Sequence, residues 1–248
     1  MQMMTEIATP TPEELLYLAK VYEEAELFED MIACMKKYAS FKPDLSTEAR
    51  TLLWVAYKNH CGSRRAAFRS LEAIEQNAEG KIPQNAALIK EYKEIIKEEI
   101  ITICQDALNV VDSVLKTSNT ISEENQVFFL KVKGDYNRYT AEYGDGERRS
   151  KACEEAFESY QKASEIAKNV LHIVNPLRLG VALNYSVFLA DVMNEKHNAC
   201  KMTRDTLDAV MADYENIPDE HYLDSTLIVS LLNDNRVLWL SEIQGEEI

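Results

Sequence analysis

The stretch RTLLWVAYKNHCGSRRAAFRSLEAIE, residues 50–75, repeats apolar side chains at helical spacing and concentrates cations in a chain of formal net charge −15. It predicts one long helix over about residues 46–80. At about 100° of rotation per residue, Arg65 and Arg69 fall within about 20° of the line through Lys58 along that helix. Like charges in such a row repel one another, so either a bound anion or neighbouring carboxylates must offset them. This stretch alone leaves both alternatives open.

The rest of the chain also has the composition of an all-α protein. Only 7 Gly and 6 Pro occur in 248 residues, and turn signals are widely spaced. They predict nine helices, over about residues 12–25, 28–38, 46–80, 85–115, 123–143, 147–170, 176–194, 195–214 and 218–240. No linker rich in Gly, Ser or Pro divides the chain. We therefore expect a single helical domain over residues 1–241 and a short, acidic, mobile tail over residues 242–248.

The overall charge and the cysteines restrict the compartment and the partners. A sequence pI near 4.8 disfavours nucleic acid and anionic membrane surfaces, because both would be repelled. The five cysteines are widely spaced and form no CxxC pair, which is typical of reduced thiols. The N-terminus lacks the features of a secretory signal, and no apolar run reaches the length of a membrane span. We expect a cytoplasmic protein.

A second basic and aromatic cluster is FFLKVKGDYNRYTAE, residues 128–142. Arg138 offers a planar fork that matches phosphate oxygens, and the phenol of Tyr139 beside it offers one directed donor. Asp135 would orient an arginine from a neighbouring helix. An ordinary helix face with ion pairs between Lys131, Asp135 and Arg138 explains the same spacing, and this alternative stays open.

Two further segments combine amides with apolar stripes. Asn184 lies in an apolar helix. Its amide either binds the backbone of an extended peptide or, as a core residue, caps a neighbouring loop through hydrogen bonds. Leu227, Leu231 and Leu238 fall within an arc of about 40° on a helix. That stripe forms either part of the core or the apolar wall of an amphipathic groove.

These residues resemble the 14-3-3 family. The matching blocks are residues 50–75, KVKGDYNRYTAE (131–142), NPLRLGVALNYSVF (175–188) and YLDSTLIVSLLNDNRVLW (222–239). They occur in the family's order and spacing, and the resemblance extends from about Glu13 to Trp239. It implies nine antiparallel helices that form a concave amphipathic groove, and a dimer through the N-terminal helices. It also implies an adapter of signal transduction that binds phosphoserine and phosphothreonine segments of client proteins.

The resemblance assigns residues to each part of the site. The phosphate would be bound by Lys58, Arg65, Arg138 and Tyr139. The peptide backbone would be held by Asn184 and Asn235. The apolar wall would consist of Leu183, Val187, Leu227, Ile228, Leu231 and Leu238. Supporting positions would be Arg69, Lys131, Asp135 and Asp191. The dimer interface would contain Ala25, Leu27, Asp30, Ala67, Tyr92, Ile95 and Glu99.

The groove segments depart from the family pattern at three positions. Asp191 stands where the family usually has Glu, which shortens that carboxylate by one methylene. Asn233 replaces an arginine, which we expect to weaken helix packing around the wall. Phe68 replaces a tryptophan before Arg69 and fills less space.

The expected dimer interface also departs from the family. Leu27 stands where an arginine is frequent and Ile95 where a lysine is frequent, although Asp30 and Glu99 keep the carboxylate positions. Exposed ion pairs contribute only about 0–1 kcal/mol each. We therefore expect dimerisation to rest on apolar burial. Ala67 replaces a serine that many members phosphorylate, so this means of splitting the dimer should be missing.

Two other functions fit the basic residues less well. A tetratricopeptide-type scaffold would bind unphosphorylated acidic tails, but the sequence lacks the repeat of about 34 residues that such scaffolds need. A phosphohydrolase would use Lys58, Arg138 and Asp135, but the four histidines show no metal-binding spacing, and no nucleophile motif occurs. We expect no catalytic residues, no metal and no cofactor. The partners would be phosphorylated proteins and a second protomer, either identical or a paralogue.

Overall fold

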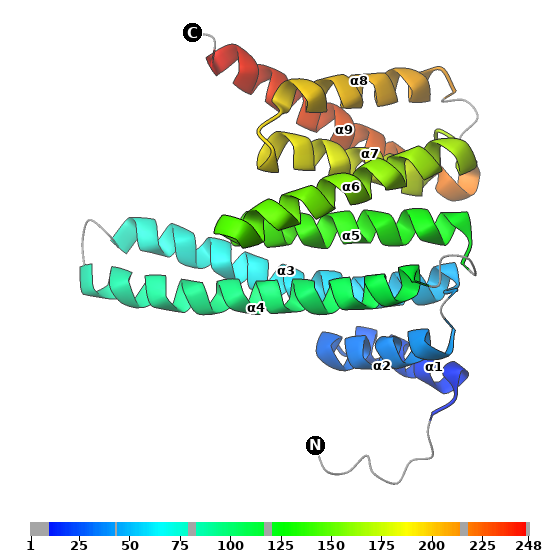
Figure 1. Cartoon of the computed structure of the whole chain (residues 1–248), viewed down its shortest axis with the longest axis horizontal. Helices are drawn as coiled ribbons and strands as arrows, with labels where there is room; N and C mark the ends of the chain where they lie inside the picture. Colours follow the sequence, from blue (N-terminus) through cyan, green and yellow to red (C-terminus); the bar gives the residue numbers. More distant parts are fainter. Residues whose placement is uncertain (1–9, 43, 79–82, 117–120, 214–217, 247–248) are drawn as a thin grey trace. The chain divides into compact units, whose positions relative to one another are not determined.

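The computed structural model describes residues 10–42, 44–78, 83–116, 121–213 and 218–246. Over these ranges the chain forms nine α-helices, one short π-helix and no strand (Figure 1). The first four helices are α1 (Pro12–Glu24), α2 (Phe28–Phe41), α3 (Thr47–Ala78) and α4 (Pro83–Leu115). The other five are α5 (Glu123–Tyr143), α6 (Gly146–Val170), α7 (Pro176–Val187), α8 (Lys196–Met211) and α9 (Asp219–Glu246). The predicted all-α class and its nine helices are confirmed.

Side-chain caps explain why several helices begin where the sequence indicated. The hydroxyl of Thr11 accepts the N–H of Glu14, and the Glu14 carboxylate accepts the N–H of Thr11, which completes a capping box before Pro12. Ser122 caps α5 through the N–H of Asn125. These caps satisfy amide groups that the first turn leaves without a partner.

The ends of α7 and α9 differ from the sequence prediction. The single helix expected over residues 176–194 changes to a π-helix, η2 (Phe188–Val192), where the N–H of Met193 donates to the carbonyl of Phe188 over 3.1 Å. α9 continues to Glu246, beyond the end expected near Leu240. Residues 242–246 are therefore helical. The mobility of the tail stays a prediction, and residues 247 and 248 lie outside the described residues.

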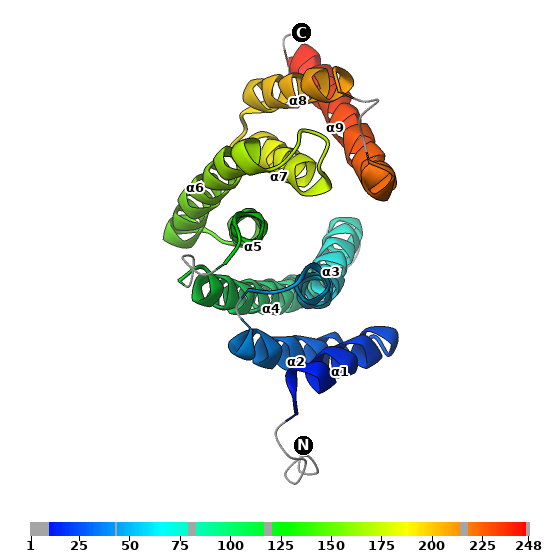
Figure 2. The same cartoon turned by 90° about the vertical axis from the view of Figure 1, so that its right-hand side faces the viewer.

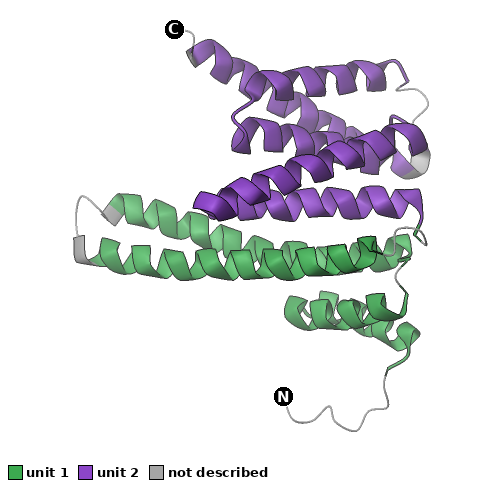
Figure 3. Cartoon of the chain, viewed as in Figure 1, with its two compact units in different colours: residues 1–121 green, residues 122–248 purple. Residues whose placement is uncertain are grey.

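The chain forms two compact units, residues 1–121 and residues 122–248 (Figure 3). Unit 1 contains α1 to α4, and unit 2 contains α5 to α9 with η2. The single domain expected over residues 1–241 stays a prediction. No helix in the described ranges is both long and apolar enough to cross a bilayer.

Unit 1 packs α1, α2 and α3 against one another and α3 along α4. Its core contains Met31, Leu53, Tyr57 and Ile100, which are almost fully buried. The ring of Trp54 stacks on Tyr57 with centroids 5.3 Å apart. This packing fixes α3 at its N-terminal half, so the cations further along it project from a rigid helix.

Unit 2 is organised around the pair α5 and α6, with α7 packed against both. Figure 2 looks along α5, with α6 and α7 beside it. α8 and α9 pack on each other and on α7. One core cluster contains Tyr160, Tyr185, Phe188 and Trp239. It lies among α6, α7, η2, α8 and α9 and supports the polar residues described next.

Candidate functional site

Arg138 is the most constrained cation of unit 2. It lies near the C-terminal end of α5, and only 9% of its surface is exposed. Its Nη1 donates to Glu142 over 2.6 Å and its Nε to the hydroxyl of Tyr160 over 3.4 Å. The guanidinium carbon lies 4.6 Å from the centre of the Tyr139 ring. Burial alone would lower the pKa of Arg138, but Tyr160, Tyr139, Asp135 and Glu142 raise it well above its usual value. The guanidinium therefore stays charged and held in one orientation.

Asp135 connects three helices of unit 2. Its carboxylate accepts hydrogen bonds from Lys131 over 2.8 Å, from Tyr160 over 2.6 Å and from Asn184 over 2.7 Å. Burial alone would raise the pKa of Asp135, but the charges of Lys131 and Arg138 and the hydrogen bonds from Lys131 and Tyr160 hold it below its usual value. Lys131 thus forms an ion pair with Asp135 within α5, which is one of the two alternatives that the sequence left open. Orientation by Asp135 of an arginine from a neighbouring helix stays a prediction.

Sequence reasoning did not identify Tyr160, which bonds to both Asp135 and Arg138. The residue lies on α6 and is fully buried. It can approach α5 because Gly134 has no side chain: a Cβ there would lie 2.6 Å from the Tyr160 ring. One signal was available, since Tyr160 is the aromatic in a stripe of buried alanines, Ala152, Ala156, Ala163 and Ala167.

Asn184 lies on α7, and Asp191 lies on the π-helix η2 that follows α7 directly. Asn184, on α7, uses one amide hydrogen toward Asp135, and its amide has a second hydrogen and a carbonyl oxygen. Asp191 lies in η2 and accepts a hydrogen bond from Trp239. Partial desolvation raises the pKa of Asp191, against the opposing charge of Arg138. The π-helix therefore carries a carboxylate that feels the charge of Arg138, and its supporting role in the site stays a prediction.

The apolar residues assigned to the groove wall divide into two kinds. Leu183, Ile228 and Val187 are partly buried and pack against the core clusters of unit 2. Leu227, Leu231 and Leu238 are exposed on α9. The interpretation of these three leucines as core is therefore wrong within unit 2. Asn235 is half-buried on the same helix. α7 and α9 pack directly on each other, so the two kinds of wall residue belong to neighbouring helices.

The cations of the opening segment lie in unit 1, on α3. Lys58 and Arg69 are exposed and Arg65 is half-buried. The neighbouring Arg64 projects elsewhere and pairs with Glu99 of α4 over 2.7 Å. α3 is continuous over Thr47–Ala78, which confirms the helix on which Lys58, Arg65 and Arg69 form a row. The convergence of Lys58 and Arg65 with Arg138 and Tyr139 stays a prediction.

The residues assigned to the dimer interface also lie in unit 1. Leu27, Tyr92 and Ile95 are exposed apolar side chains, about half of each being accessible. Ala25 and Asp30 are exposed, Ala67 is half-buried, and Glu99 is engaged by Arg64. Tyr17 and Val21 on α1 are further exposed apolar residues that sequence reasoning missed.

Cysteines and histidines occupy no joint site in the described ranges. Four cysteines are buried and Cys153 is half-buried. His60 lies 3.7 Å from Glu29, and His172 lies 3.0 Å from Asp213. Within the same ranges, no group of three or more His, Cys, Asp or Glu side chains is arranged to hold a metal ion.

Sequence comparison relates the chain to one family of known proteins. The sequence model of the family described as 14-3-3 protein matches residues 18–240. The chain is 43% identical to the checkpoint signal transducer rad24 of Schizosaccharomyces pombe over 96% of its length and 88% of that protein. It is also 43% identical to 14-3-3 protein epsilon of Drosophila melanogaster, covering 95% of this chain and 90% of the relative. Protein BMH2 of Saccharomyces cerevisiae is 44% identical, over 96% and 88% of the two chains.

Proposed function

Since the chain belongs to the 14-3-3 family, we propose that it is a phosphopeptide-binding adapter. Its ligands would be phosphoserine and phosphothreonine segments of client proteins. Family membership supports binding to phosphorylated partners, and the 14-3-3 names of the relatives support the adapter role. Adapters of this kind carry out no chemistry on the ligand, so we assign no catalytic residue, metal or cofactor.

The observation that carries the proposal is the buried, charged and braced guanidinium of Arg138. A phosphate monoester carries about −1.5 to −2 charges at pH 7 and accepts bidentate hydrogen bonds. A guanidinium held in one orientation loses little conformational entropy when it binds such a group. Tyr139, whose ring lies against Arg138, supplies a phenol on the same helix turn.

Lys58 and Arg65 would supply the other two cations of the phosphate site, with Arg69 and Lys131 in support. Three cations that face one another repel unless an anion lies between them. An unphosphorylated serine leaves this repulsion in place, whereas the phosphate removes it. Discrimination between the two peptides should therefore be several kcal/mol in order of magnitude.

The ligand's backbone and side chains would meet α7 and α9. Asn184 and Asn235 would bond to the main chain of an extended peptide, because an amide offers both donors and an acceptor. The exposed Leu227, Leu231 and Leu238 would form the apolar wall together with Leu183, Val187 and Ile228. This wall would give a modest sequence preference.

Dimerisation would place two such grooves in one particle. Doubly phosphorylated clients would then gain affinity through effective concentration, so the protein would mask, clamp or bridge its clients. We infer that the dimer forms through unit 1 by burial of Leu27, Tyr92 and Ile95, with either an identical protomer or a paralogue. The acidic surface and reduced thiols fit a cytoplasmic location.

Fluorescence anisotropy tests the binding function. A labelled peptide rich in Arg and Ser with a central phosphoserine is titrated with the wild-type chain, alongside its unphosphorylated twin. We expect only the phosphopeptide to bind, and we expect Arg65→Ala to weaken that binding by about tenfold or more.

The matched control is Arg64→Ala, which removes the same charge one position away from a side chain paired with Glu99. It should leave the phosphopeptide affinity nearly unchanged. Equal binding of the two peptides would replace the adapter proposal with a general acidic-tail scaffold. Release of inorganic phosphate from the bound peptide would instead support an enzyme.

A further inference from the structure

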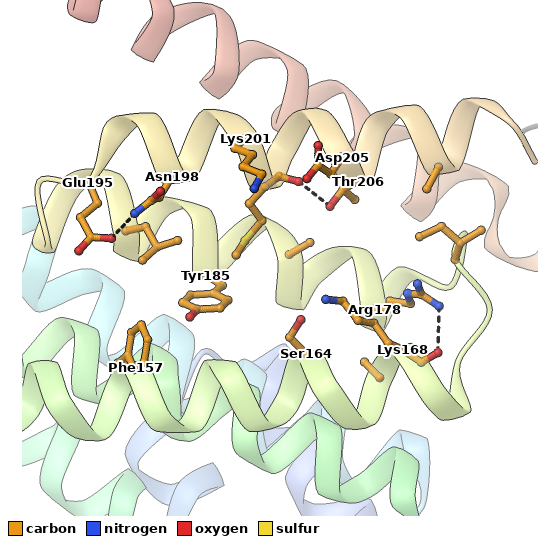
Figure 4. A pocket seen from close by; sticks show the side chains of 16 residues that line it. Phe157, Ser164, Lys168, Arg178, Tyr185, Glu195, Asn198, Lys201, Asp205 and Thr206 are labelled. Carbon is orange, nitrogen blue, oxygen red and sulfur yellow. Dashed lines mark hydrogen bonds between the residues drawn. The ribbon is translucent and has the colours of Figure 1, made fainter.

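Unit 2 contains a cavity of about 580 Å³ among α6, α7 and α8 (Figure 4). α6 and α8 form its two walls, and α7 forms the floor between them. Pockets that hold small organic ligands typically measure about 300–1,000 Å³. None of the residues proposed above for phosphopeptide binding lines this cavity.

The cavity is open because small side chains line it on all three helices. Ala167 lies on α6, Ala182 on α7 and Ala209 on α8, and each leaves space that a larger apolar residue would fill. Helices that pack directly normally interdigitate their side chains without voids of this size. The volume is therefore set by the sequence of all three elements.

Apolar side chains line one part of the cavity. Phe157 of α6 and Tyr185 of α7 meet edge to face with centroids 6.1 Å apart. Leu189 and Met202 extend this surface. Phe157 is partly exposed although it is a large apolar residue, so covering it with a ligand would be favourable. Figure 4 shows Phe157 and Tyr185 at the same end as Glu195 and Asn198.

Two of the three cations that line the cavity lie at the opposite end, and the third lies near its middle (Figure 4). Lys168 of α6 and Arg178 of α7 lie side by side at that end, and Lys201 of α8 points into the cavity between Asn198 and Asp205. Arg178 donates to the carbonyl of Leu171 over 2.8 Å, which anchors it at the end of α6. Among the described residues, neither the Lys168 nor the Lys201 ammonium forms an ion pair. In a chain of net charge −15, two such ammoniums in one cavity favour an anion.

Two carboxylates also line the cavity, and both have partners. Asp205 lies 3.4 Å from the guanidinium of Arg204. Glu195 accepts a hydrogen bond from Asn198 over 2.8 Å, at the end away from Lys168 and Arg178. The charge of Asp205 is thus partly offset by Arg204, and the charge of Glu195 lies far from Lys168 and Arg178. The cavity is consequently polarised, with Lys168 and Arg178 at one end and the rings of Phe157 and Tyr185, beside the paired Glu195 and Asn198, toward the other.

We propose that this cavity is a second ligand site, for a small amphiphilic anion whose carboxylate or sulfonate meets Lys168, Lys201 and Arg178. Its apolar body would lie on Ala182, Tyr185 and Phe157. Phe157 and Lys168 are eleven residues apart on α6, which corresponds to about 16 Å at the helical rise. A medium-length alkyl chain or a fused aromatic system fits that distance, whereas inorganic anions would leave the apolar end uncovered.

The test uses two fluorescent probes of the same shape, anilinonaphthalene sulfonate and its uncharged parent anilinonaphthalene, with dodecanoate as competitor. We expect the sulfonate to bind the wild-type chain at one saturable site and to be displaced by dodecanoate. The double variant Lys168→Glu/Lys201→Glu should weaken the binding of the sulfonate by about tenfold or more and leave the affinity for the neutral probe unchanged. Ala182→Phe, which fills the floor, should weaken both probes.

The matched control is Lys151→Glu/Lys162→Glu, which changes the net charge equally on exposed positions of α6 outside the cavity. A loss of sulfonate binding in this control as large as in the cavity variant would overturn the proposal. So would equal binding of both probes, or the absence of saturable binding. Arg65→Ala should retain the sulfonate site. Loss of the probe in Arg65→Ala would assign the binding to the basic row on α3 and likewise overturn the proposal.

Discussion

The hydroxyl of Tyr160 donates to Oδ1 of Asp135 over 2.6 Å, although the two residues lie 25 positions apart on different helices. The same hydroxyl accepts the Nε–H of Arg138 over 3.4 Å. One phenol therefore fixes the buried carboxylate of α5 and steadies the guanidinium one helical turn further along. The orientation of Arg138 depends on the packing of α5 against α6 as much as on its own helix.

Replacing Tyr160 by Phe should test this dependence. Tyr160→Phe removes the hydroxyl and leaves the ring packing, so the buried Asp135 and Arg138 each lose a partner. We expect a decrease of about 1–3 kcal/mol in the free energy of unfolding, measured by urea denaturation. We also expect weaker phosphopeptide binding. Tyr222→Phe on the exposed side of α9 is the control and should stay within about 0.5 kcal/mol of wild type. An unchanged stability of Tyr160→Phe would contradict the role of the hydroxyl.

Two glycine substitutions should have opposite effects. Gly134→Ala places a Cβ 2.6 Å from the Tyr160 ring, so the helices must shift, and we expect a loss of about 1–3 kcal/mol in stability. Gly62→Ala, in α3, meets nothing within 4 Å and should gain about 0.5–1 kcal/mol, because alanine favours the helix. Thermal unfolding of the pair checks this. A similar change in both variants would mean that contact with Tyr160 is not the cause.

The depressed pKa of Asp135 predicts a pH dependence of stability. A carboxyl whose pKa is lower in the folded chain than its unfolded value, about 3.9, stabilises the fold above that pH. This contribution is lost as the pH falls from about 4 through the folded pKa. Asp135→Asn should therefore be less stable than wild type at pH 7, and the difference should shrink in acid. Denaturation at several pH values measures it.

The control for the pH series is Asp234→Asn, which removes an exposed carboxylate of α9. Its stability at pH 7 should stay within about 0.5 kcal/mol of wild type. The pKa of Asp106 in unit 1 is also lowered, despite burial, by hydrogen bonds from Lys36 and Tyr57. Wild type and both variants share the contribution of Asp106. Only the difference in stability between a variant and wild type therefore reports the contribution of Asp135. A constant difference between Asp135→Asn and wild type would contradict the assignment.

The exposed apolar residues of unit 1 predict how the dimer is broken. Leu27 and Ile95 are 48% and 51% exposed in the isolated chain. Full burial of an exposed side chain of this size contributes about 1.5–3 kcal/mol, so covering the exposed half of each contributes about half of that. Leu27→Glu/Ile95→Glu should weaken self-association by about a hundredfold or more in sedimentation equilibrium. Leu223→Glu, at a site 80% exposed on α9, should leave the dimer intact. A wild-type chain that is monomeric at micromolar concentration would contradict the apolar interface.

Much of the fold was predictable because helix ends carry local signals. The bounds of α5 followed from the Ser122 cap and from the glycine-rich turn that begins at Gly144. The π-helix after Val187 was not predictable, since the apolar pattern continues through it and only the hydrogen bonds change register. The extension of α9 beyond Leu240 was missed because the residues that follow contain no strong helix stop other than Gly245.

The candidate site was only partly predictable for a similar reason. Lys131 and Asp135 lie four positions apart on one helix, so their ion pair follows from spacing alone. The contacts of Asp135 with Tyr160 and Asn184 join separate helices, and spacing carries no information about them. Apolar residues occur all round α9, so the pattern did not reveal that Leu227 and Leu231 point away from the core of unit 2.

The chain has two tryptophans, and each unit contains one of them: Trp54 on α3 and Trp239 on α9. Both are buried, Trp54 against Tyr57 and Trp239 in the cluster around Tyr160. Each half of the molecule thus carries its own intrinsic fluorophore. Trp54→Phe leaves emission from unit 2 alone, and Trp239→Phe leaves emission from unit 1 alone. Coincident melting of these two signals would define one cooperative domain, and separate melting would define two.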